Sequence, residues 1–412
     1  MNAPAPTRNV PMDYLRMFLT LLVVAHHAAL AYHPYAPPRG ASLLAQPRLW
    51  MAFPVIDSAH MPGADLLVGF NDVFFMSLMF LISGIFTSAS LMKKRPATFL
   101  RDRAKKLGAG FVFSAAILAP LAYYPAYLSM TPQRGTFWHQ WLALGEWPAG
   151  PAWFLWLLLA FASIATIVHA FAPGWNAVLG RFVARVGDRP IRFFAAMIVI
   201  SSITYLPMAA RFEPFRWVNA GPFYVQISRL LHYFAYFVIG MALGAYGVDR
   251  GLLANGSRLA RRWVLWSLAS VAAFAVALVT FVIILSTLAK GGPGRLLGTF
   301  GNFTFVLSCA ASSLAFLALF VRFAHRRNRV ADSLAANAFG IYLVHYFCVS
   351  WLQFALLGTR ISGAAKGPLV FLGAVAASWM LVAGFRRLAA IVRGRRAWRD
   401  QAIELAPSRA IR

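Results

Sequence analysis

The sequence has little charge and very few acidic side chains. Only 12% of its 412 residues are charged, whereas a soluble domain carries about 25%. Asp and Glu number 12, against 39 Lys and Arg, and 60% of the residues are hydrophobic. This composition excludes an ordinary soluble domain and predicts an integral membrane protein.

Cysteine is also scarce. Cys309 and Cys348 are the two cysteines, and both fall inside long apolar runs. We expect them to be small core residues rather than a disulfide or a redox pair. His and Cys nowhere cluster with metal-ligand spacing, so neither a metal site nor a permanently bound cofactor is expected.

Apolar runs of about twenty residues recur along the chain. They predict an all-α membrane protein, a polytopic bundle of about ten transmembrane helices. The predicted domain is 12–391, between a disordered cytoplasmic tail at 1–11 and a basic cytoplasmic tail at 392–412. The predicted spans are 12–33, 72–92, 107–129, 152–172, 191–209, 230–248, 263–289, 299–321, 334–357 and 369–391.

The formal net charge of +27 follows the topology of the chain and does not indicate nucleic acid. One set of alternate segments, which includes both tails, holds more than twice as many Lys and Arg residues as the other set. The positive-inside rule then predicts that both termini are cytoplasmic, in agreement with an even number of spans. The partner that this charge predicts is the lipid bilayer.

Arg16 and His27 are the most informative residues, because ionisable side chains inside an apolar run are costly and usually functional. They are eleven residues apart, which places them on one helix face about 16 Å apart along the axis. Thr20 shares that face, and Asp13 precedes Arg16 by one turn. The alternative makes Arg16 a snorkelling anchor and His27 a helix-packing residue. His26, the neighbouring residue, points to a different face of the helix, so we do not expect it to share a site with His27.

A cleavable signal peptide is an alternative interpretation of the N-terminal segment. Arg8, an apolar run and the sequence Ala29-Leu30-Ala31 resemble such a signal. The length of the run and its interruption by Arg16 and His27 favour a retained span.

Three connecting segments have an unusual composition. Segment 93–106 is a predicted cytoplasmic loop rich in Lys and Arg, which suits a polyanionic donor or simply fixes the topology. The external loop 34–71 is long and rich in proline, and is either a lid or an interfacial loop. The external loop 130–151 carries several Trp residues, which suit sugar rings but suit the bilayer interface better.

Six short elements occur in order along residues 13–345. They are Asp13-Tyr14-Leu15-Arg16 with His27, Phe80-Leu81-Ile82-Ser83-Gly84, Arg103-Ala104-Lys105-Lys106-Leu107, Trp153-Phe154-Leu155, Phe237-Val238-Ile239-Gly240 with Gly244, and Ile341-Tyr342-Leu343-Val344-His345. Together they resemble the acyltransferase 3 family of membrane acyltransferases. Two features depart from the family. Lys106 stands where the family pattern has Arg, which removes a bidentate donor, and the Ser-x-Glu-Glu element of one branch is absent.

The resemblance implies a multi-pass enzyme of the bacterial cytoplasmic (inner) membrane. Such an enzyme moves a short acyl group, acetyl or succinyl, from cytoplasmic acyl-CoA to a hydroxyl of an extracytoplasmic carbohydrate, such as a periplasmic glucan or surface polysaccharide. Ten spans without an appended domain look most like the glucan-modifying, succinyl-transferring branch.

The resemblance also suggests roles for individual residues. His27 acts as general base or forms an acyl-histidine, Arg16 guides the thioester arm, and Asp13 orients Arg16. The expected contacts of the CoA phosphates are Arg101, Arg103 and Lys106. The expected substrate contacts are Trp153, Ser83 and His345, although helix packing is an equal alternative for His345.

Two other classes of function fit the polar seam. A secondary transporter or flippase would use Arg16 and His27 as a proton or substrate path. The absence of visible repeats weighs against it, and such a protein would move solute without consuming a CoA thioester. A structural partner in an envelope complex would lose only stability when Arg16 and His27 are replaced.

Overall fold

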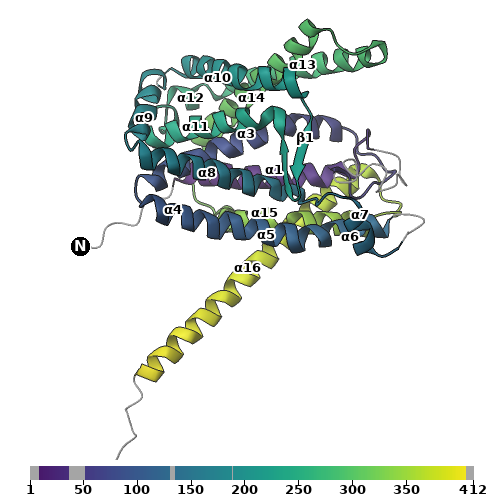
Figure 1. Ribbon diagram of the computed structural model, residues 1–412, viewed down its shortest axis with the longest axis vertical. Coiled ribbons are helices and arrows are strands. Elements are labelled where there is room, and N and C mark those ends of the chain that lie inside the picture. The colour runs from purple at the N-terminus through teal and green to yellow at the C-terminus, as the bar shows by residue number, and fades with distance from the viewer. Residues whose placement is uncertain (1–8, 37–51, 130–134, 188, 405–412) are drawn as a thin grey trace, which may run out of the picture.

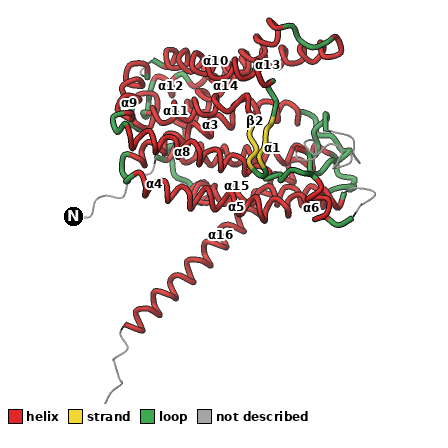
Figure 2. The backbone as a smooth tube through the Cα atoms, in the orientation of Figure 1, coloured by secondary structure: helices red, strands yellow, loops and turns green. Residues whose placement is uncertain are grey.

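The computed structural model describes residues 9–36, 52–129, 135–187 and 189–404. These residues form a bundle of helices with one short β-hairpin (Figures 1 and 2). The first half contains α1 (Val10–Leu30), α3 (Ala64–Leu91), α4 (Pro96–Arg103), α5 (Ala109–Phe113), α6 (Ala119–Leu128), α7 (Phe137–Ala143), α8 (Trp153–Phe171) and α9 (Trp175–Val186). The second half contains α10 (Pro190–Phe212), β1 (Trp217–Ala220), β2 (Phe223–Gln226), α11 (Leu230–Tyr246), α12 (Arg258–Arg261), α13 (Trp263–Thr287), α14 (Arg295–Phe323), α15 (Arg329–Ala355) and α16 (Gly363–Glu404).

Among the described residues, nine helices are long and apolar enough to cross a membrane, which confirms the all-α polytopic class. The nine correspond to the second to tenth predicted spans. The first predicted span, α1, is not among them, because Asp13, Arg16, His26 and His27 lower its hydropathy. Even so, α1 lies inside the bundle, in contact with α3, α14, α15 and α16. Shielding by these helices makes its polar residues tolerable.

Successive long helices run in alternating directions, so their connections gather at two ends of the bundle (Figure 1). We call one end the basic side. There α1 begins, and there the chain passes from α3 to α4, from α8 to α10, from α11 to α13 and from α14 to α15 (Figure 1). The other end is the hairpin side, where β1 and β2 lie. The Lys- and Arg-rich segments between spans therefore share one end, as the charge count predicts.

The structure corrects two expectations about connecting segments and adds a helix that was not expected. Residues 93–106 do not form a loop, because α4 begins at Pro96 and continues through π-helical turns into the span that ends at Leu128. Residues 64–71 belong to α3, which begins eight residues before the predicted span. The segment after α8 contains the helix α9, whose apolar Val183 is buried while Arg181 and Arg185 are exposed.

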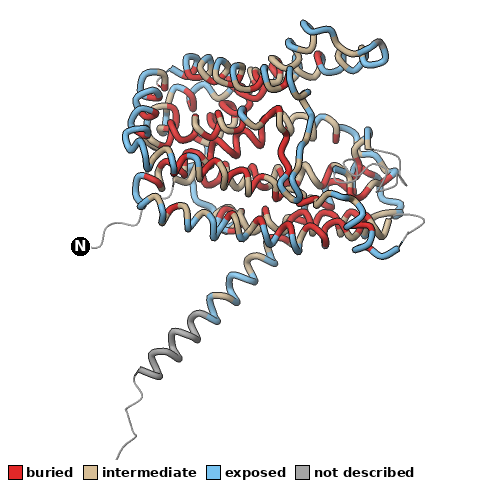
Figure 3. Tube along the Cα trace, in the orientation of Figure 1, coloured by how far each residue is buried: buried red, intermediate tan, exposed pale blue. Residues whose placement is uncertain are grey.

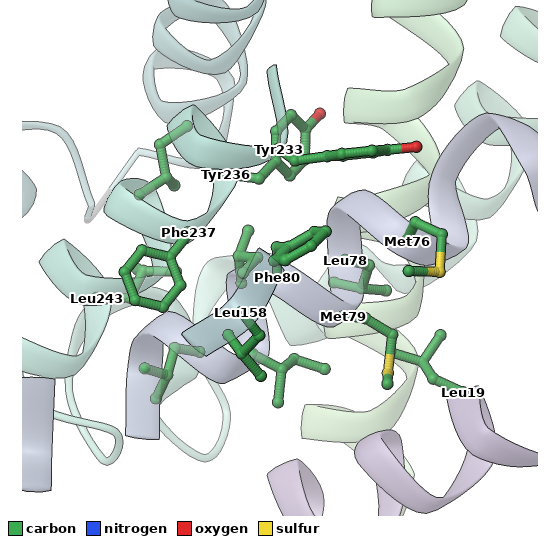
Figure 4. Close-up of a cluster of buried hydrophobic side chains, with 14 of the residues drawn as sticks. Leu19, Met76, Leu78, Met79, Phe80, Leu158, Tyr233, Tyr236, Phe237 and Leu243 are labelled. Carbon is green, nitrogen blue, oxygen red and sulfur yellow. The ribbon is translucent and has the colours of Figure 1, made fainter. Parts of the chain in front are cut away.

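The tightest packing joins α3 and α11. A Cβ added to Gly84 would collide with the carbonyl oxygen of Phe237, and one added to Gly240 or Gly244 would collide with the carbonyl oxygens of Leu81 or Ile85. Small residues thus let the two backbones approach closely, as the spacing of Gly240 and Gly244 suggests. Around this contact Phe80 stacks on Tyr233 in the main apolar core (Figure 4). Buried residues are concentrated where the long helices pack together (Figure 3).

The described part of the external loop is fixed to the bundle. Backbone amides of Asp57 and Met61 donate to the carbonyls of Ala31 and Tyr32. Lys366 of α16 donates to Asp57 at 2.6 Å, with both side chains buried. Ala52 lines the cavity described below, so this loop reaches its edge. The predicted lid falls partly on 37–51, which lie outside the described residues.

Candidate functional site

A cavity of about 300 Å³ opens between the helices near the hairpin side. Its walls come from segments far apart in the sequence, including α1, α3, α8, the β-hairpin, α11 and α15. The lining is largely aromatic, with a few polar groups, as is typical of ligand sites. The lining residues that matter here are His26, His27, Asp72, Trp153, Trp217, Asn219, Tyr224, Gln226, Tyr233, Tyr342 and Tyr346.

His27 lies in the wall of this cavity, in the last turns of α1. Its Nδ1 is 2.8 Å from the carbonyl oxygen of Val23. Because a carbonyl oxygen only accepts, Nδ1 must carry a hydrogen, and in the neutral ring the lone pair is then on Nε2. The ring also lies edge-on to Tyr346, with 5.0 Å between centroids. The backbone of α1 therefore fixes both the orientation of His27 and the nitrogen that can act as a base.

His345 lies beside His27, with 5.2 Å between the ring centroids. Its Nδ1 is 2.6 Å from the carbonyl oxygen of Tyr342, so Nε2 again holds the lone pair. This Nε2 is buried, and no described residue bonds to it. His345 lines a smaller cavity of about 20 Å³, which shares Tyr342 and Tyr346 with the larger one. The two histidines are far apart in the sequence, and the packing of α1 on α15 brings them together.

The expectation that His26 stays apart from the site is wrong. His26 lines the same cavity as His27, and its ring stacks on Phe75 at 5.4 Å. The angular separation on the helix is real, but the cavity is wide enough to reach two adjacent faces of α1.

An ion pair that the sequence analysis missed borders the cavity. Arg229, at the start of α11, donates to the carboxylate of Asp72 at 2.7 Å and to the Asp72 carbonyl at 3.0 Å. Arg229 has a side chain only 3% exposed, whereas that of Asp72 is 44% exposed and lines the cavity. The buried cation therefore holds a carboxylate at the cavity surface.

The β-hairpin forms another wall, and the sequence analysis missed it as well. Trp217 pairs with Gln226, and Asn219 pairs with Tyr224, so all four side chains lie on one face of the hairpin. That face is turned to the cavity. Gly221 takes a positive φ of +56° at the turn, a conformation that glycine adopts without strain.

Two hydrogen bonds fix this hairpin. The indole of Trp156 donates to the Tyr224 carbonyl at 3.0 Å. The Tyr224 hydroxyl donates to the Glu146 carboxylate at 3.0 Å. Glu146 belongs to the external loop 130–151, so this loop supports the cavity wall indirectly.

Arg16 lies about 16 Å from His27 along α1, toward the basic side. Its guanidinium donates to Asp13 at 3.1 Å, which confirms the predicted pair. It also lies over the ring of Phe86, 5.2 Å from the centroid. Thr20 is buried and bonds to the Arg16 carbonyl. The polar face of α1 is therefore real, with a cation at one end and an imidazole at the other.

Arg103 and Lys106 join Arg16 on the basic side. Both lie near enough to Arg16 to interact with its charge. Arg103 lies over Phe99 at 5.0 Å, and Lys106 lies over Phe339 of α15 at 4.7 Å. We call Arg16, Arg103 and Lys106 the cationic cluster. Arg101 is exposed on α4, and no described contact brings it into the cluster.

The other two predicted substrate contacts have different positions. Trp153 lines the cavity, and its ring stands edge-on to Trp217 at 5.5 Å. Ser83 does not line it. Ser83 is partly exposed, one turn from Phe86 and therefore nearer to Arg16 than to His27.

The site residues that the sequence analysis did not identify lie in recognisable sequence contexts. Asp72 and Arg229 lie at the edges of predicted spans, where charges are usually read as loop residues. Alternation in Trp217-Val218-Asn219-Ala220, followed by Gly221-Pro222, is typical of a strand and turn. Which of these residues share a cavity is decided by the packing of distant helices.

The family comparison covers all the segments that form the site. The model of the acyltransferase 3 family, described as an acyltransferase domain, matches residues 9–383. No curated protein and no solved structure was found to match the chain. The match includes α1 with Arg16 and His27, the cationic cluster and every wall of the cavity. The chain therefore belongs to the acyltransferase 3 family and is a multi-pass membrane acyltransferase.

Proposed function

We propose that this protein transfers a short acyl group, acetyl or succinyl, from cytoplasmic acyl-CoA to a hydroxyl of an extracytoplasmic carbohydrate. The observation that carries the proposal is the placement of His27. Its ring lines the cavity near the hairpin side, while the cationic cluster lies near the basic side. A donor and an acceptor on opposite faces of a membrane require such an arrangement.

The cationic cluster supplies the donor end of the proposal. Arg16, Arg103 and Lys106 offer a concentrated positive charge that suits the phosphates of CoA. About 16 Å along α1 separates this charge from His27. The donor must therefore carry its acyl group on a long arm away from its phosphates, and CoA is built in that way. We assign Arg101 a minor part, because no described interaction joins it to Arg16, Arg103 or Lys106.

His27 supplies the acceptor chemistry. In the general-base route, Nε2 takes the proton of the acceptor hydroxyl while its oxygen attacks the thioester carbon. The carbon–sulfur bond then breaks, the CoA thiolate leaves, and the proton on His27 is available to the sulfur. In the covalent route, Nε2 itself attacks the thioester, and the hydroxyl attacks the resulting acyl-histidine. Both routes form one ester and release one CoA thiol.

The test is mass spectrometry of extracytoplasmic glycans from cells that lack the protein. The cells are complemented with wild type, His27→Ala or His325→Ala at matched membrane levels. His325 is an exposed histidine outside the cavity and serves as the matched control. We expect the acyl mass to return with wild type and His325→Ala but not with His27→Ala. Acylation restored by His27→Ala would refute the mechanism, and no glycan mass dependent on the protein would refute the carbohydrate acceptor.

A further inference from the structure

We propose that the hairpin face and Asp72 form the acceptor subsite, and that this subsite selects a neutral sugar over an anionic one. The hairpin face consists of Trp217, Asn219, Tyr224 and Gln226. This inference rests on the proposed function, because it assigns the acceptor end of the same cavity.

The hairpin face has the side chains of a sugar-binding wall. Two aromatic and two amide side chains share one face of a short hairpin, by the cross-strand pairs Trp217 with Gln226 and Asn219 with Tyr224. All four line the cavity. Aromatic rings offer apolar faces to the C–H groups of a sugar, and amides both donate to and accept from hydroxyls. A lipid acceptor would have no use for the amides.

The aromatic side chains at this end of the cavity have the shape of a corner. Trp153 meets Trp217 at an interplanar angle of 83°, and lies against Tyr233 with 6.0 Å between centroids. Indoles at right angles form a corner rather than a flat wall. A corner suits a compact ring better than an extended acyl chain.

The cavity lining carries a carboxylate. Among the described lining residues, Asp72 is the one carboxylate, and none is Lys or Arg. The Arg229 guanidinium lies behind Asp72 and holds its carboxylate toward the cavity. An ionised carboxylate accepts hydrogen bonds from hydroxyls, but it repels a second carboxylate. A uronic acid or other anionic sugar is therefore disfavoured.

Hydrogen bonds hold the hairpin face in place. Tyr224 is tied to Glu146 and, through its carbonyl, to Trp156. Gln226 donates to the Pro214 carbonyl at 2.9 Å, which leaves its carbonyl oxygen to accept. A face fixed in this way loses little entropy when it binds a ligand.

The experiment measures binding alone, without an acyl donor. A neutral β-linked glucose pentasaccharide is titrated into the full chain in nanodiscs, and binding is followed by saturation-transfer NMR. A pentasaccharide ending in glucuronic acid is the anionic comparison. The variants are Trp217→Ala, Asn219→Ala and Asp72→Asn. Val218→Ala is the matched control, because Val218 lies between Trp217 and Asn219 on the opposite face of the same strand.

We expect the wild type and Val218→Ala to bind the neutral probe equally. Each of the three cavity variants should weaken binding by about tenfold. Asn219→Ala and Asp72→Asn each weaken or remove a hydrogen bond to the sugar, and Trp217→Ala removes an aromatic face. The anionic probe should bind the wild type more weakly than the neutral one. In Asp72→Asn that difference should shrink. Asn219→Ala keeps the test decisive if Asp72→Asn fails to fold.

Three results would overturn the inference. In the first, the wild type does not bind the neutral probe. In the second, Asn219→Ala and Val218→Ala bind the neutral probe equally. In the third, the wild type binds the anionic probe more tightly than the neutral one. Failure of the proposed function is a separate result. If the probe binds with these variant effects but is not acylated when acyl-CoA is added, acyl transfer is refuted and the acceptor subsite still stands. If Asn219→Ala and Trp217→Ala acylate the acceptor with an unchanged KM, the subsite is refuted and acyl transfer still stands.

Discussion

His27 and His345 resemble each other in their hydrogen bonding. Each donates from Nδ1 to a backbone carbonyl of its own helix, and each therefore has its lone pair on Nε2 when neutral. Only His27 lines the large cavity, while His345 lines the small one. Of the two, His27 is therefore the one that faces the cavity in which we propose that the acceptor binds, and His345 lies beside it.

This difference predicts unequal effects of substitution. His27→Ala should lower kcat by about a hundredfold or more, the usual worth of a general base. His345→Gln, which keeps the volume of the side chain, should lower kcat by only about tenfold. The measurement is release of the CoA thiol by protein in nanodiscs. A larger loss in His345→Gln than in His27→Ala would reverse the roles assigned here.

The cationic cluster gives a second prediction. Arg103→Ala and Lys106→Ala should each raise the KM for acyl-CoA by about tenfold, because each removes a charged hydrogen-bond donor. Arg101→Ala should raise it much less, since Arg101 lies outside the cluster. Arg185→Ala on α9 is the control for general loss of positive charge. Equal effects of Arg101→Ala and Arg103→Ala would contradict this division.

Sequence reasoning found some site residues but not others, for physical reasons. Arg16 and His27 are visible because helical spacing alone puts them on one face, and the Asp13–Arg16 pair is local. Asp72 and Arg229 are 157 residues apart, and no local pattern connects them. His26 and His27 are consecutive on α1 and diverge by about 100°, but the width of a cavity depends on neighbouring helices.

Among the elements, the contact of α3 with α11 depends on glycine. Gly240→Ala should destabilise the protein by about 1–3 kcal/mol, because the added Cβ meets the Leu81 backbone and only a shift of the helices can relieve it. Gly298→Ala on α14 is the matched control, since nothing lies within 4 Å of its added Cβ. Thermal stability by fluorescence-detected size-exclusion chromatography compares them. Equal stability of the two variants would show that the helices are not in close contact.

The ion pair of Asp57 with Lys366 holds the external loop to α16. Lys366→Met should destabilise the protein by about 3–5 kcal/mol, because it leaves a buried carboxylate without its cation. Adding Asp57→Leu should restore much of that stability, since both charges are then gone. The same thermal assay measures both. A double variant no more stable than Lys366→Met would argue against a buried pair.

The sequence predicted the elements that are defined by the length of an apolar run. It did not predict the elements that are rich in charged residues or defined by short alternation of polar and apolar residues. Long apolar runs identified the spans, because a helix is the simplest spanning structure. Residues 93–106 were expected to be a loop, yet a helix tolerates Lys and Arg at a membrane surface as well as a loop does. Each strand of the hairpin has only four residues, and so short an alternation of side chains is a weak signal for a strand.

For the whole molecule, the basic side should face the cytoplasm and the hairpin side the exterior. Lys93→Cys and Ala220→Cys, in a background of Cys309→Ala and Cys348→Ala, report on the two sides. We expect a membrane-impermeant maleimide to label Ala220→Cys in intact spheroplasts, and Lys93→Cys only after permeabilisation. Labelling of Lys93→Cys in intact spheroplasts would invert the topology and with it the assignment of donor and acceptor sides.

The most direct measurement is a sided transfer assay in proteoliposomes. Carbon-13-labelled acetyl-CoA or succinyl-CoA is trapped inside, and a membrane-impermeant glucose oligosaccharide is added outside. Only molecules with the basic side inward can use both substrates, so molecules inserted in the opposite orientation do not contribute to the signal. We expect the label to become esterified to the external oligosaccharide, with equal release of CoA thiol inside, and neither to occur with His27→Ala. Movement of the oligosaccharide without thiol release, or transfer by His27→Ala at the wild-type rate, would contradict transmembrane acyl transfer through His27.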